Sequence, residues 1–319
     1  MTQPILNIKA TYSTLSSSEL LHQVVPLYKI PNLTSCEFYH RGLNDTYKLS
    51  SGKELFMLRV YRKNWRTRSE IEFELEAIMY LHQAGAAVAI PIERKAGGFI
   101  TSIMAPEGER CVIITKFAKG KILKFNNVKD AMTFGRAAAE VHSCSAGFQS
   151  HACRYPLDLT HLIEQPLVSI KPYLSRRPSD WHFLNEFAVS LSRLVNAADT
   201  LDYGFCHGDF HGENAHEHDG KVTHFDFDCC GLGWRIYDLA TFKWVLRLLE
   251  KEDRLWSSFL DGYKSKRDIS ELDQQFKIPI YGHKAVLKSF SCRGCHLAKG
   301  NCSTRLEKRK SRCESYLNS

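Results

Sequence analysis

The chain has 319 residues, of which 44% are hydrophobic and 24% are charged. This composition is typical of a soluble globular protein with a core large enough for two lobes. No apolar run approaches the roughly 20 residues that cross a bilayer. The N-terminal residues also lack the pattern of a signal peptide, so we expect a cytoplasmic protein with free thiols.

The net charge of +8 comes from one end of the chain. Residues 277–319 contain ten Lys or Arg and two Glu, which accounts for the whole excess, whereas residues 1–276 are balanced. A basic tail of this kind is usually a solvated segment. We therefore expect neither nucleic acid nor a membrane as a partner.

The N-terminal third alternates apolar strands with turns. A helix capped by Ser69 is predicted over about residues 70–83, where apolar residues recur at helical spacing. Strands are predicted on both sides of it, over residues 36–41, 46–49, 55–61, 88–92 and 110–116. These elements predict a lobe made of a small sheet and one helix, which we assign to residues 1–115.

Residues 116–120 are predicted to form a hinge, after which the pattern becomes mainly helical. A second lobe is assigned to residues 121–276, and residues 277–319 form an atypical basic tail. Helices are predicted over 129–143, 180–201, 236–250 and 255–264, with short strands and loops over 204–233.

The most specific motif runs from His207 to Asn214 and is followed by a second Asp, Asp226. Asp209 can orient and deprotonate a hydroxyl, while Asn214 and Asp226 can hold Mg²⁺ against nucleotide phosphates. The spacing of Asp209 and Asn214 equals that of the catalytic loop of protein kinases. The alternative is that these three residues are only polar turn residues between short strands. It would require three residue types to match the kinase pattern at three fixed offsets by chance. His207 is expected to brace the loop.

Two further histidines near this motif raise the alternative of a different metal site. His211 and His216 could join Asp209, but no third nitrogen or thiolate ligand at a suitable spacing is evident. We therefore favour the phosphoryl-transfer interpretation.

With Tyr237–Ala240, these motifs resemble the Brenner-type signature of the aminoglycoside phosphotransferase superfamily, also called the kinase-like phosphotransferases. The run Leu58–Arg62, the helix carrying Glu74 and the run Phe225–Gly231 resemble one branch in particular. That branch includes the bacterial stress-response Ser/Thr kinase and type II homoserine kinases. The resemblance covers roughly residues 36–276.

The resemblance implies a two-lobed protein-kinase-like α+β fold, with a small antiparallel sheet lobe and a larger, mainly helical lobe. It also implies ATP as the phosphoryl donor, Mg²⁺ as cofactor and a hydroxyl acceptor. Asp209 would be the catalytic base, and Asn214 and Asp226 the Mg²⁺ ligands.

On the nucleotide side, Arg59 occupies the strand position where kinases place the Lys that contacts the α- and β-phosphates. Glu74 is its expected partner, with Glu72 and Glu76 as rivals. Arg keeps the charge of Lys but not its geometry. The alternative is that Arg59 is a strand-end cation that extends to water.

The turn Gly42–Thr46 is the candidate phosphate-covering loop, through its backbone N–H groups, Asn44 and Thr46. It has one Gly and not the Gly-rich pattern of protein kinases. From the resemblance, we expect the hinge backbone near Lys116 and Ala118 to hold the adenine.

The acceptor is expected to bind in the helical lobe, near Tyr155–Leu162, Trp234–Arg235 and the helix of Trp256. The chain runs from Asp226 almost directly into a helix, which leaves no room for an activation segment and disfavours a regulated protein kinase. Asp238 is expected to cap or brace its helix. A small-molecule hydroxyl acceptor (an aminoglycoside, amino alcohol or homoserine-like compound) is thus the first expectation, a protein Ser/Thr the second, and an inactive nucleotide-binding pseudokinase the third.

The tail offers three further interpretations. Cys292–His296 matches the C-x-x-C-H pattern of haem c attachment, which requires an exported protein. Four cysteines could bind zinc, although their spacing is irregular: Cys292, Cys295, Cys302 and Cys313. The tail lacks the aromatic-rich helix of the resembled family, so we hypothesise an altered reading frame near Lys277. That change would leave the acceptor pocket incomplete.

Overall fold

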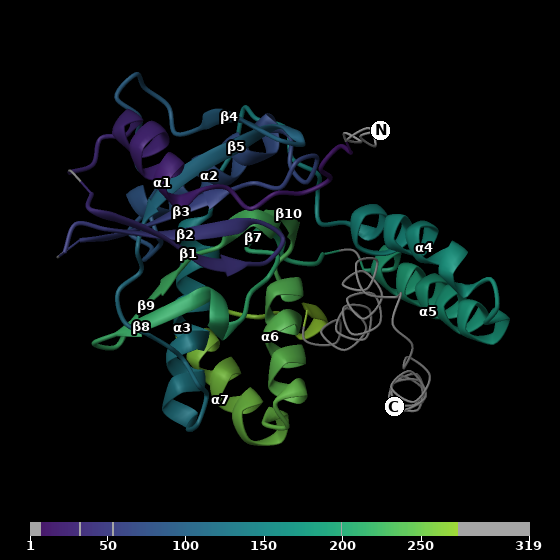
Figure 1. Ribbon diagram of the computed structural model, residues 1–319. Coiled ribbons are helices and arrows are strands. Elements are labelled where there is room, and N and C mark those ends of the chain that lie inside the picture. The colour runs from purple at the N-terminus through teal and green to yellow at the C-terminus, as the bar shows by residue number, and fades with distance from the viewer. Residues whose placement is uncertain (1–7, 32, 53, 199, 274–319) are drawn as a thin grey trace, which may run out of the picture. The chain divides into compact units, whose positions relative to one another are not determined.

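The computed structural model describes residues 8–273 apart from 32, 53 and 199, so the predictions for residues 277–319 lie outside the described residues (Figure 1). The described residues divide into two compact units. The first contains the residues up to Lys119, with Gln149–Arg154 and Thr223–Phe225. The second contains Gly120–Phe148, Tyr155–Val222 and the residues from Asp226 onward.

Within the described residues, the first unit is built on a five-stranded antiparallel sheet in the order β1-β2-β3-β5-β4. Short helical turns precede it: α1 (Ser17–Glu19), η1 (Leu20–Val24) and η2 (Val25–Leu27). The strands are β1 (Ser35–Arg41), β2 (Asp45–Ser50), β3 (Leu55–Val60), β4 (Thr101–Ala105) and β5 (Gly108–Lys116).

The two faces of this sheet are covered by different elements. Along β3, Leu58 and Val60 are fully buried and pack with the residues of η1 and η2. Because side chains alternate along a strand, Arg59 points to the opposite face. Its register partner Ile113 lies on that face, in a cluster with the helix residue Ile71. The alternation of β3 therefore directs Arg59 toward the helix that covers the second face.

That helix is α2 (Arg68–Gln83), and its N-terminus differs from the prediction. Thr67 is the N-cap: its hydroxyl accepts from the N–H of Glu70, whose side chain accepts from the N–H of Thr67. This reciprocal capping box satisfies two N–H groups that the helix leaves unpaired. Ser69, the predicted cap, is already inside the helix.

The predicted strand over residues 88–92 is present only as isolated bridges, from Val88 to His224 and from Pro91 to Thr115. Pro91 has no N–H to donate to a ladder, which limits strand pairing here. Strand β4 was not predicted, since its five residues lack a continuous apolar pattern.

The second unit is mainly helical. Its longer helices are α3 (Val128–Cys144), α5 (Pro178–Asn196), α6 (Ile236–Leu248) and α7 (Glu252–Lys264), with the shorter η3 (Thr160–Glu164), α4 (Gln165–Ile170) and η4 (Lys171–Leu174). The predicted helix over 180–201 ends at Asn196, and no Gly or Pro marks that end in the sequence.

Short strands support the loops of this unit. Strand β7 (Tyr203–Cys206) pairs with β10 (Gly231–Trp234), and β6 (Lys121–Ile122) pairs with β8 (Ala215–His218). The strand β9 (Lys221–His224) joins β8, and its last residues belong to the first unit. The single turns η5 (Gly212–Asn214) and η6 (Phe227–Cys229) complete the set.

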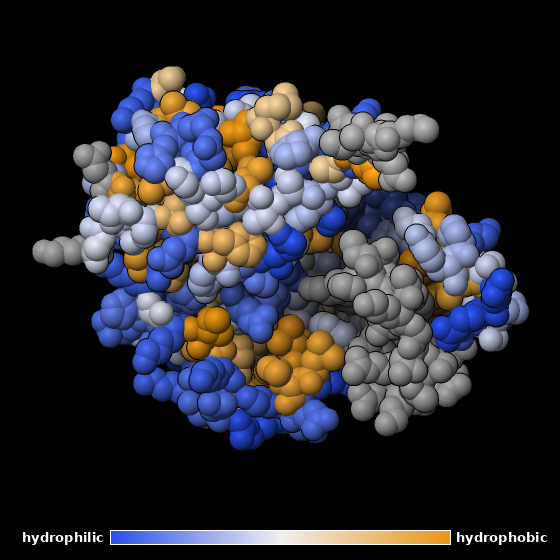
Figure 2. Space-filling view, viewed as in Figure 1, coloured by the Kyte–Doolittle hydropathy of each residue, from blue (hydrophilic) through white to orange (hydrophobic). Residues whose placement is uncertain are grey.

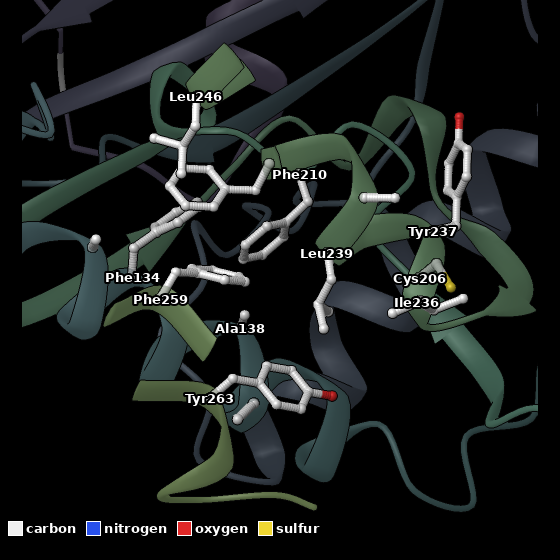
Figure 3. Packing of buried hydrophobic residues seen from close by; sticks show 14 of the residues in the cluster. Phe134, Ala138, Cys206, Phe210, Ile236, Tyr237, Leu239, Leu246, Phe259 and Tyr263 are labelled. Carbon is white, nitrogen blue, oxygen red and sulfur yellow. The ribbon is translucent and has the colours of Figure 1, made fainter. Parts of the chain in front are cut away.

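The core of the second unit is a cluster of phenylalanines between α3, α6 and α7 (Figure 3). The ring centroid of Phe134 lies 4.6 Å from that of Phe210 and 4.8 Å from that of Phe242. Helices α3 and α7 approach very closely, because a Cβ on Gly135 would lie 2.0 Å from the carbonyl oxygen of Phe259. Phe210 follows Asp209 directly, so this core also anchors the loop that carries the motif.

Among the described residues, no helix is both long and apolar enough to cross a membrane. On the face shown in Figure 2, hydrophobic residues lie in separate groups between hydrophilic ones.

Candidate active site

In the first unit, the predicted ion pair between strand and helix is formed. The Arg59 guanidinium donates to Glu74 Oε1 at 2.8 Å, with the Glu74 side chain only 1% exposed. Tyr61 Oη donates to the other oxygen of Glu74, also at 2.8 Å. This second donor was not predicted from the sequence. The carboxylate is therefore held by two neighbouring residues of one chain segment.

The two rival acids have partners elsewhere. Glu72 pairs with Arg68 at 3.1 Å on the exposed side of α2. Glu76 accepts a hydrogen bond of 2.5 Å from the hydroxyl of Ser150. Helical geometry explains this, since Glu76 lies about 200° around the helix from Glu74.

The turn between β1 and β2 uses its side chains to hold its own shape. Asn44 is 8% exposed, and its Oδ1 accepts from the backbone N–H of Arg62 at 3.0 Å. The hydroxyl of Thr46 donates to the carbonyl of His40 at 3.1 Å. These bonds fix a hairpin whose tip is Gly42–Asn44.

At the end of β5, the backbone N–H of Lys116 donates to Ile90 and that of Phe117 donates to Leu55. These two N–H groups are therefore used within the unit. Ala118 follows as a buried residue, 7% exposed.

In the second unit, Asp209 and Asn214 lie side by side in the loop that follows β7. Asn214 Nδ2 donates to the backbone carbonyl of Asp209 at 2.9 Å and lies 3.5 Å from its Oδ2. His211 Nε2 contacts the same Oδ2 at 3.1 Å. Because His211 Nδ1 accepts from the N–H of Glu213, the neutral ring carries its proton on Nε2 and donates it to Asp209.

This loop requires a glycine at position 208. Gly208 has a φ of +80°, and a Cβ there would lie 1.9 Å from the carbonyl oxygen of Cys229. The loop therefore passes directly over the turn η6 that follows Asp226. His207 braces it, as expected: its ring is fully buried, and its Nδ1 accepts from the N–H of Asp209 at 3.3 Å.

Asp238 supports the loop that carries the motif. From the sequence we expected it to cap or brace its own helix, but its side chain does not cap α6. Its carboxylate accepts from the backbone N–H groups of His207 at 2.6 Å and Gly208 at 2.8 Å. His142 Nε2 lies 3.2 Å from the same carboxylate, and His142 Nδ1 lies 2.9 Å from Tyr263 Oη. Three helices, α3, α6 and α7, thus meet beneath the loop.

The electrostatics of this network favour an ionised Asp238. Burial raises the pKa of its carboxyl, but the hydrogen bond and charge of His142, with the bonds from His207, hold the pKa below its ordinary value. Burial raises the pKa of Tyr263 well above its ordinary value, so the phenol keeps its proton beside Nδ1 of His142. Neither His142 nor Tyr263 was predicted, because both come from helices distant in sequence.

Asp226 has a left-handed backbone, with φ 62° and ψ 58°, at the point where the chain leaves β9 and enters η6. Only η6 and β10 separate it from α6, which begins at Ile236. The short connection expected from the sequence is thus present.

Asn214 and Asp226 both offer side-chain oxygen atoms as possible metal ligands. Asn214 donates from Nδ2 to the backbone carbonyl of Asp209, so its Oδ1 points away from that carbonyl and can accept or bind elsewhere. Carboxylate and amide oxygens are the ligands that Mg²⁺ prefers. In the part of the chain that the structure describes, no three His, Cys, Asp or Glu side chains are grouped to hold a metal ion. The alternative site of Asp209, His211 and His216 is therefore not formed.

Two of the segments expected to line the acceptor site lie close to the loop along the sheet of β7 and β10. Leu157 N–H donates to the carbonyl of Leu232 at 2.7 Å, and the ring of Tyr155 stacks on His161 at 3.8 Å. Trp234 packs against Tyr203. Trp256 instead stacks on Phe259 in the core.

Comparison with known proteins identifies the family. A family model described as the phosphotransferase enzyme family matches residues 37–269. The chain belongs to this family. A relative from Synechocystis, described as an uncharacterized protein, is 32% identical over 269 residues, which cover 83% of this chain and 74% of the relative.

Two solved structures of kinases share the fold of this family member. One is the amicoumacin kinase hAmiN in complex with AMP-PNP, Ca²⁺ and Ami, with a TM-score of 0.79, 21% identity and 93% of each chain covered. The other is a microcompartment-associated aminopropanol kinase, with a TM-score of 0.72, 21% identity and 94% of each chain covered. These structures confirm the two-lobed kinase-like fold, and the family match confirms the assignment as a phosphotransferase.

Proposed function

We propose that the protein transfers the γ-phosphoryl group of Mg·ATP to a hydroxyl group of a small molecule, with amino alcohols as the first substrate class. The observation that carries this proposal is the arrangement around Asp209. Its side chain is 25% exposed and is held by Asn214 and His211. An oriented, partly exposed carboxylate is what proton abstraction from a bound hydroxyl requires.

In this proposal Asp209 accepts the proton of the acceptor hydroxyl while the phosphoryl group is transferred. His211 orients the carboxylate through its bond to Oδ2. Asp238 fixes the loop backbone through His207 and Gly208. Phosphoryl transfer depends mostly on positioning and on charge neutralisation, and these contacts supply the positioning.

Arg59, oriented by Glu74, is proposed to contact the nucleotide phosphates. The turn bearing Asn44 and Thr46 is proposed to cover the phosphates with its backbone N–H groups. The adenine is proposed to bind at the backbone near Lys116 and Ala118. The backbone N–H of Lys116 already donates to the carbonyl of Ile90, so Lys116 would contact the adenine through its own carbonyl.

Asn214 and Asp226 are proposed to hold Mg²⁺. The ion would neutralise charge on the phosphate oxygens. Removal of divalent cations with EDTA should abolish nucleotide-dependent activity, and adding back Mg²⁺ should restore it. Asp226→Ala should lose affinity for Mg·ATP, whereas unchanged affinity would contradict the assignment of this ligand.

A small acceptor is favoured over a protein Ser/Thr by the connection after Asp226. Nine residues separate Asp226 from Ile236, and they are occupied by η6 and β10. Protein kinases use a longer activation segment between these positions. The similar folds of an aminopropanol kinase and an amicoumacin kinase agree with an amine-bearing small acceptor. A cytoplasmic location, expected from the sequence, stays a prediction.

The test is a coupled assay of ADP release across amino alcohols, aminoglycosides, homoserine and a Ser/Thr protein substrate. We expect turnover that depends on a small acceptor and disappears in Asp209→Asn. Turnover with the protein substrate alone would replace the proposal by a protein kinase. Binding of Mg·ATP without turnover on any acceptor would favour the pseudokinase.

A further inference from the structure

A short segment after α3 runs along helix α2. Residues 149–154, called here the strap, belong to the same compact unit as α2 although they follow it by more than 60 residues. The strap is joined to α2 by side-chain and backbone hydrogen bonds at both ends of the segment.

Three hydrogen bonds make the attachment. Ser150 Oγ donates to Glu76 Oε2 at 2.5 Å, and the backbone N–H of Cys153 donates to Ser69 Oγ at 2.7 Å. The guanidinium of Arg154 donates to the carbonyl of Glu70 at 3.2 Å. The bonds to a carboxylate and from a guanidinium are charge-assisted, which makes them stronger than neutral ones.

The strap also has internal order at the residue that contacts Glu76. The hydroxyl of Ser150 accepts from the N–H of Ala152 at 3.0 Å while it donates to Glu76. Its position is therefore set by the backbone of the strap, and the bond to Glu76 transmits that position to α2.

Helical geometry shows why the strap fixes the orientation of Glu74. Ser69 and Glu76 are seven residues apart and lie on one face of α2, whereas Glu74 lies about 200° away from Glu76. On the face of Glu74, the helix is tied to the sheet through Arg59 and Tyr61. The helix is thus held from opposite faces.

We propose that the strap is a positioning device that keeps α2 in the orientation where Glu74 remains paired with Arg59. The inference rests on the proposed function, because that pair is assigned to the nucleotide. In protein kinases, the position of this helix is controlled by a phosphorylated activation loop. Here the connection after Asp226 is nine residues long, and the strap holds the helix permanently.

The consequence is an enzyme in which α2 needs no activation to keep Glu74 paired with Arg59. Ser150 and Ser69 act through Glu74 and Arg59 and are positioning residues. Weakening the strap should lower the fraction of molecules in which α2 keeps Glu74 paired with Arg59. The apparent nucleotide affinity should fall in proportion to that fraction.

The central experiment compares Ser150→Ala with Ser150→Thr and with the control Glu72→Gln. Glu72 lies on the same helix and pairs with Arg68 on the exposed side of α2, so its substitution reports general effects on the helix. Affinity for Mg·AMP-PNP is measured by calorimetry, alongside the thermal midpoint. Ser150→Ala should bind about three- to tenfold more weakly, while Ser150→Thr and Glu72→Gln bind like the wild type.

Two further measurements separate positioning from a general loss of stability. In a Glu74→Gln background, Ser150→Ala should cause no additional loss of affinity, because the strap acts through Glu74. Amide hydrogen exchange should rise in α2 but not in β2, β3 and β5. Equal affinity of Ser150→Ala and wild type, or a loss that persists in the Glu74→Gln background, would overturn the proposal.

Failure of the proposed function would look different. If the wild type did not bind Mg·AMP-PNP, the nucleotide assignment would be wrong. Hydrogen exchange would then still test whether the strap holds α2. If it does, α2 must lose protection in Ser150→Ala and keep it in Glu72→Gln.

Discussion

The carboxylate of Asp238 accepts the backbone N–H of His207 at 2.6 Å, across 31 residues of sequence. Through this bond and the one to Gly208, a helix residue determines where the next residue, Asp209, is placed. The carboxylate is fully buried, so its contacts cannot be replaced by water. Asp238 is thus a positioning residue for the proposed base.

Replacing Asp238 by Asn should damage both stability and turnover. His207 and Gly208 each donate an N–H to a different carboxylate oxygen, and the amide replaces one of these two acceptors by a donor. We expect a loss of about 3 kcal/mol in unfolding free energy and a fall in kcat of about 10²-fold from a displaced loop. Urea unfolding and steady-state kinetics measure the two effects. Asp253→Asn, at an exposed site on α7, is the control; equal effects of the two changes would argue against this role.

The same carboxylate should make stability depend on acidity. The folded state holds the pKa of Asp238 below its ordinary value of 3.8. As the pH falls through 3.8, this carboxyl takes up its proton in the unfolded chain before it does so in the folded protein. The stabilisation that the ionised carboxylate gives at higher pH is therefore lost as the pH falls further. Unfolding free energies between about pH 2 and pH 5 should therefore fall less steeply in Asp238→Asn than in the wild type. Parallel curves would show that another group dominates the acid response.

Asp209→Asn should separate catalysis from binding. The amide keeps the size of the side chain but cannot accept the hydroxyl proton. Turnover should fall about 10²- to 10⁴-fold, while affinity for Mg·AMP-PNP stays the same. Glu213→Gln, an exposed acid in the same loop, should leave both unchanged. A variant that retains most of its turnover would remove Asp209 from the role of base.

Tyr61→Phe should weaken the anchoring of Glu74. The change removes the donor to Glu74 Oε2 but keeps the packing of the ring. Since Glu74 is buried, we expect a loss of about 1–3 kcal/mol in stability and a higher KM for ATP with little change in KM for the acceptor. Tyr39→Phe, on an exposed strand position, is the matched control. A KM for ATP equal to that of the wild type would show that Arg59 alone suffices.

Arg110 gives a prediction about folding and not about chemistry. Its buried guanidinium pairs with Asp45 at 3.1 Å and Glu107 at 3.2 Å, and also donates to the carbonyl of Tyr61. Arg110→Met would remove the buried cation that both carboxylates share and leave Asp45 with its 3.6 Å pair to the exposed Arg41, so it should cost about 3–5 kcal/mol. Arg68→Met breaks an exposed pair and should change stability by less than about 1 kcal/mol. Thermal unfolding of the two variants provides the comparison.

Much of the fold and the chemical motif could be predicted from local sequence. Arg59 was assigned from its strand position and Glu74 as its partner, with helical spacing against Glu76, and the observed pairs agree. These predictions succeeded because strand and helix periods are properties of neighbouring residues. The ends of α5 and the cap of α2 were less well predicted, since competing caps and packing decide them.

What the sequence by itself determined is the order of the chemical groups: an Asp, an Asn five residues later and a second Asp, after a strand bearing a cation. What only the tertiary structure decided is which distant groups hold them. His142 reaches Asp238 across 96 residues, Tyr263 reaches His142 across 121, and Ser150 reaches Glu76 across 74. No periodicity records such contacts, because they arise when separate elements pack around one buried carboxylate or one helix face. Their effect on the proposed site is positional, and position is what phosphoryl transfer depends on.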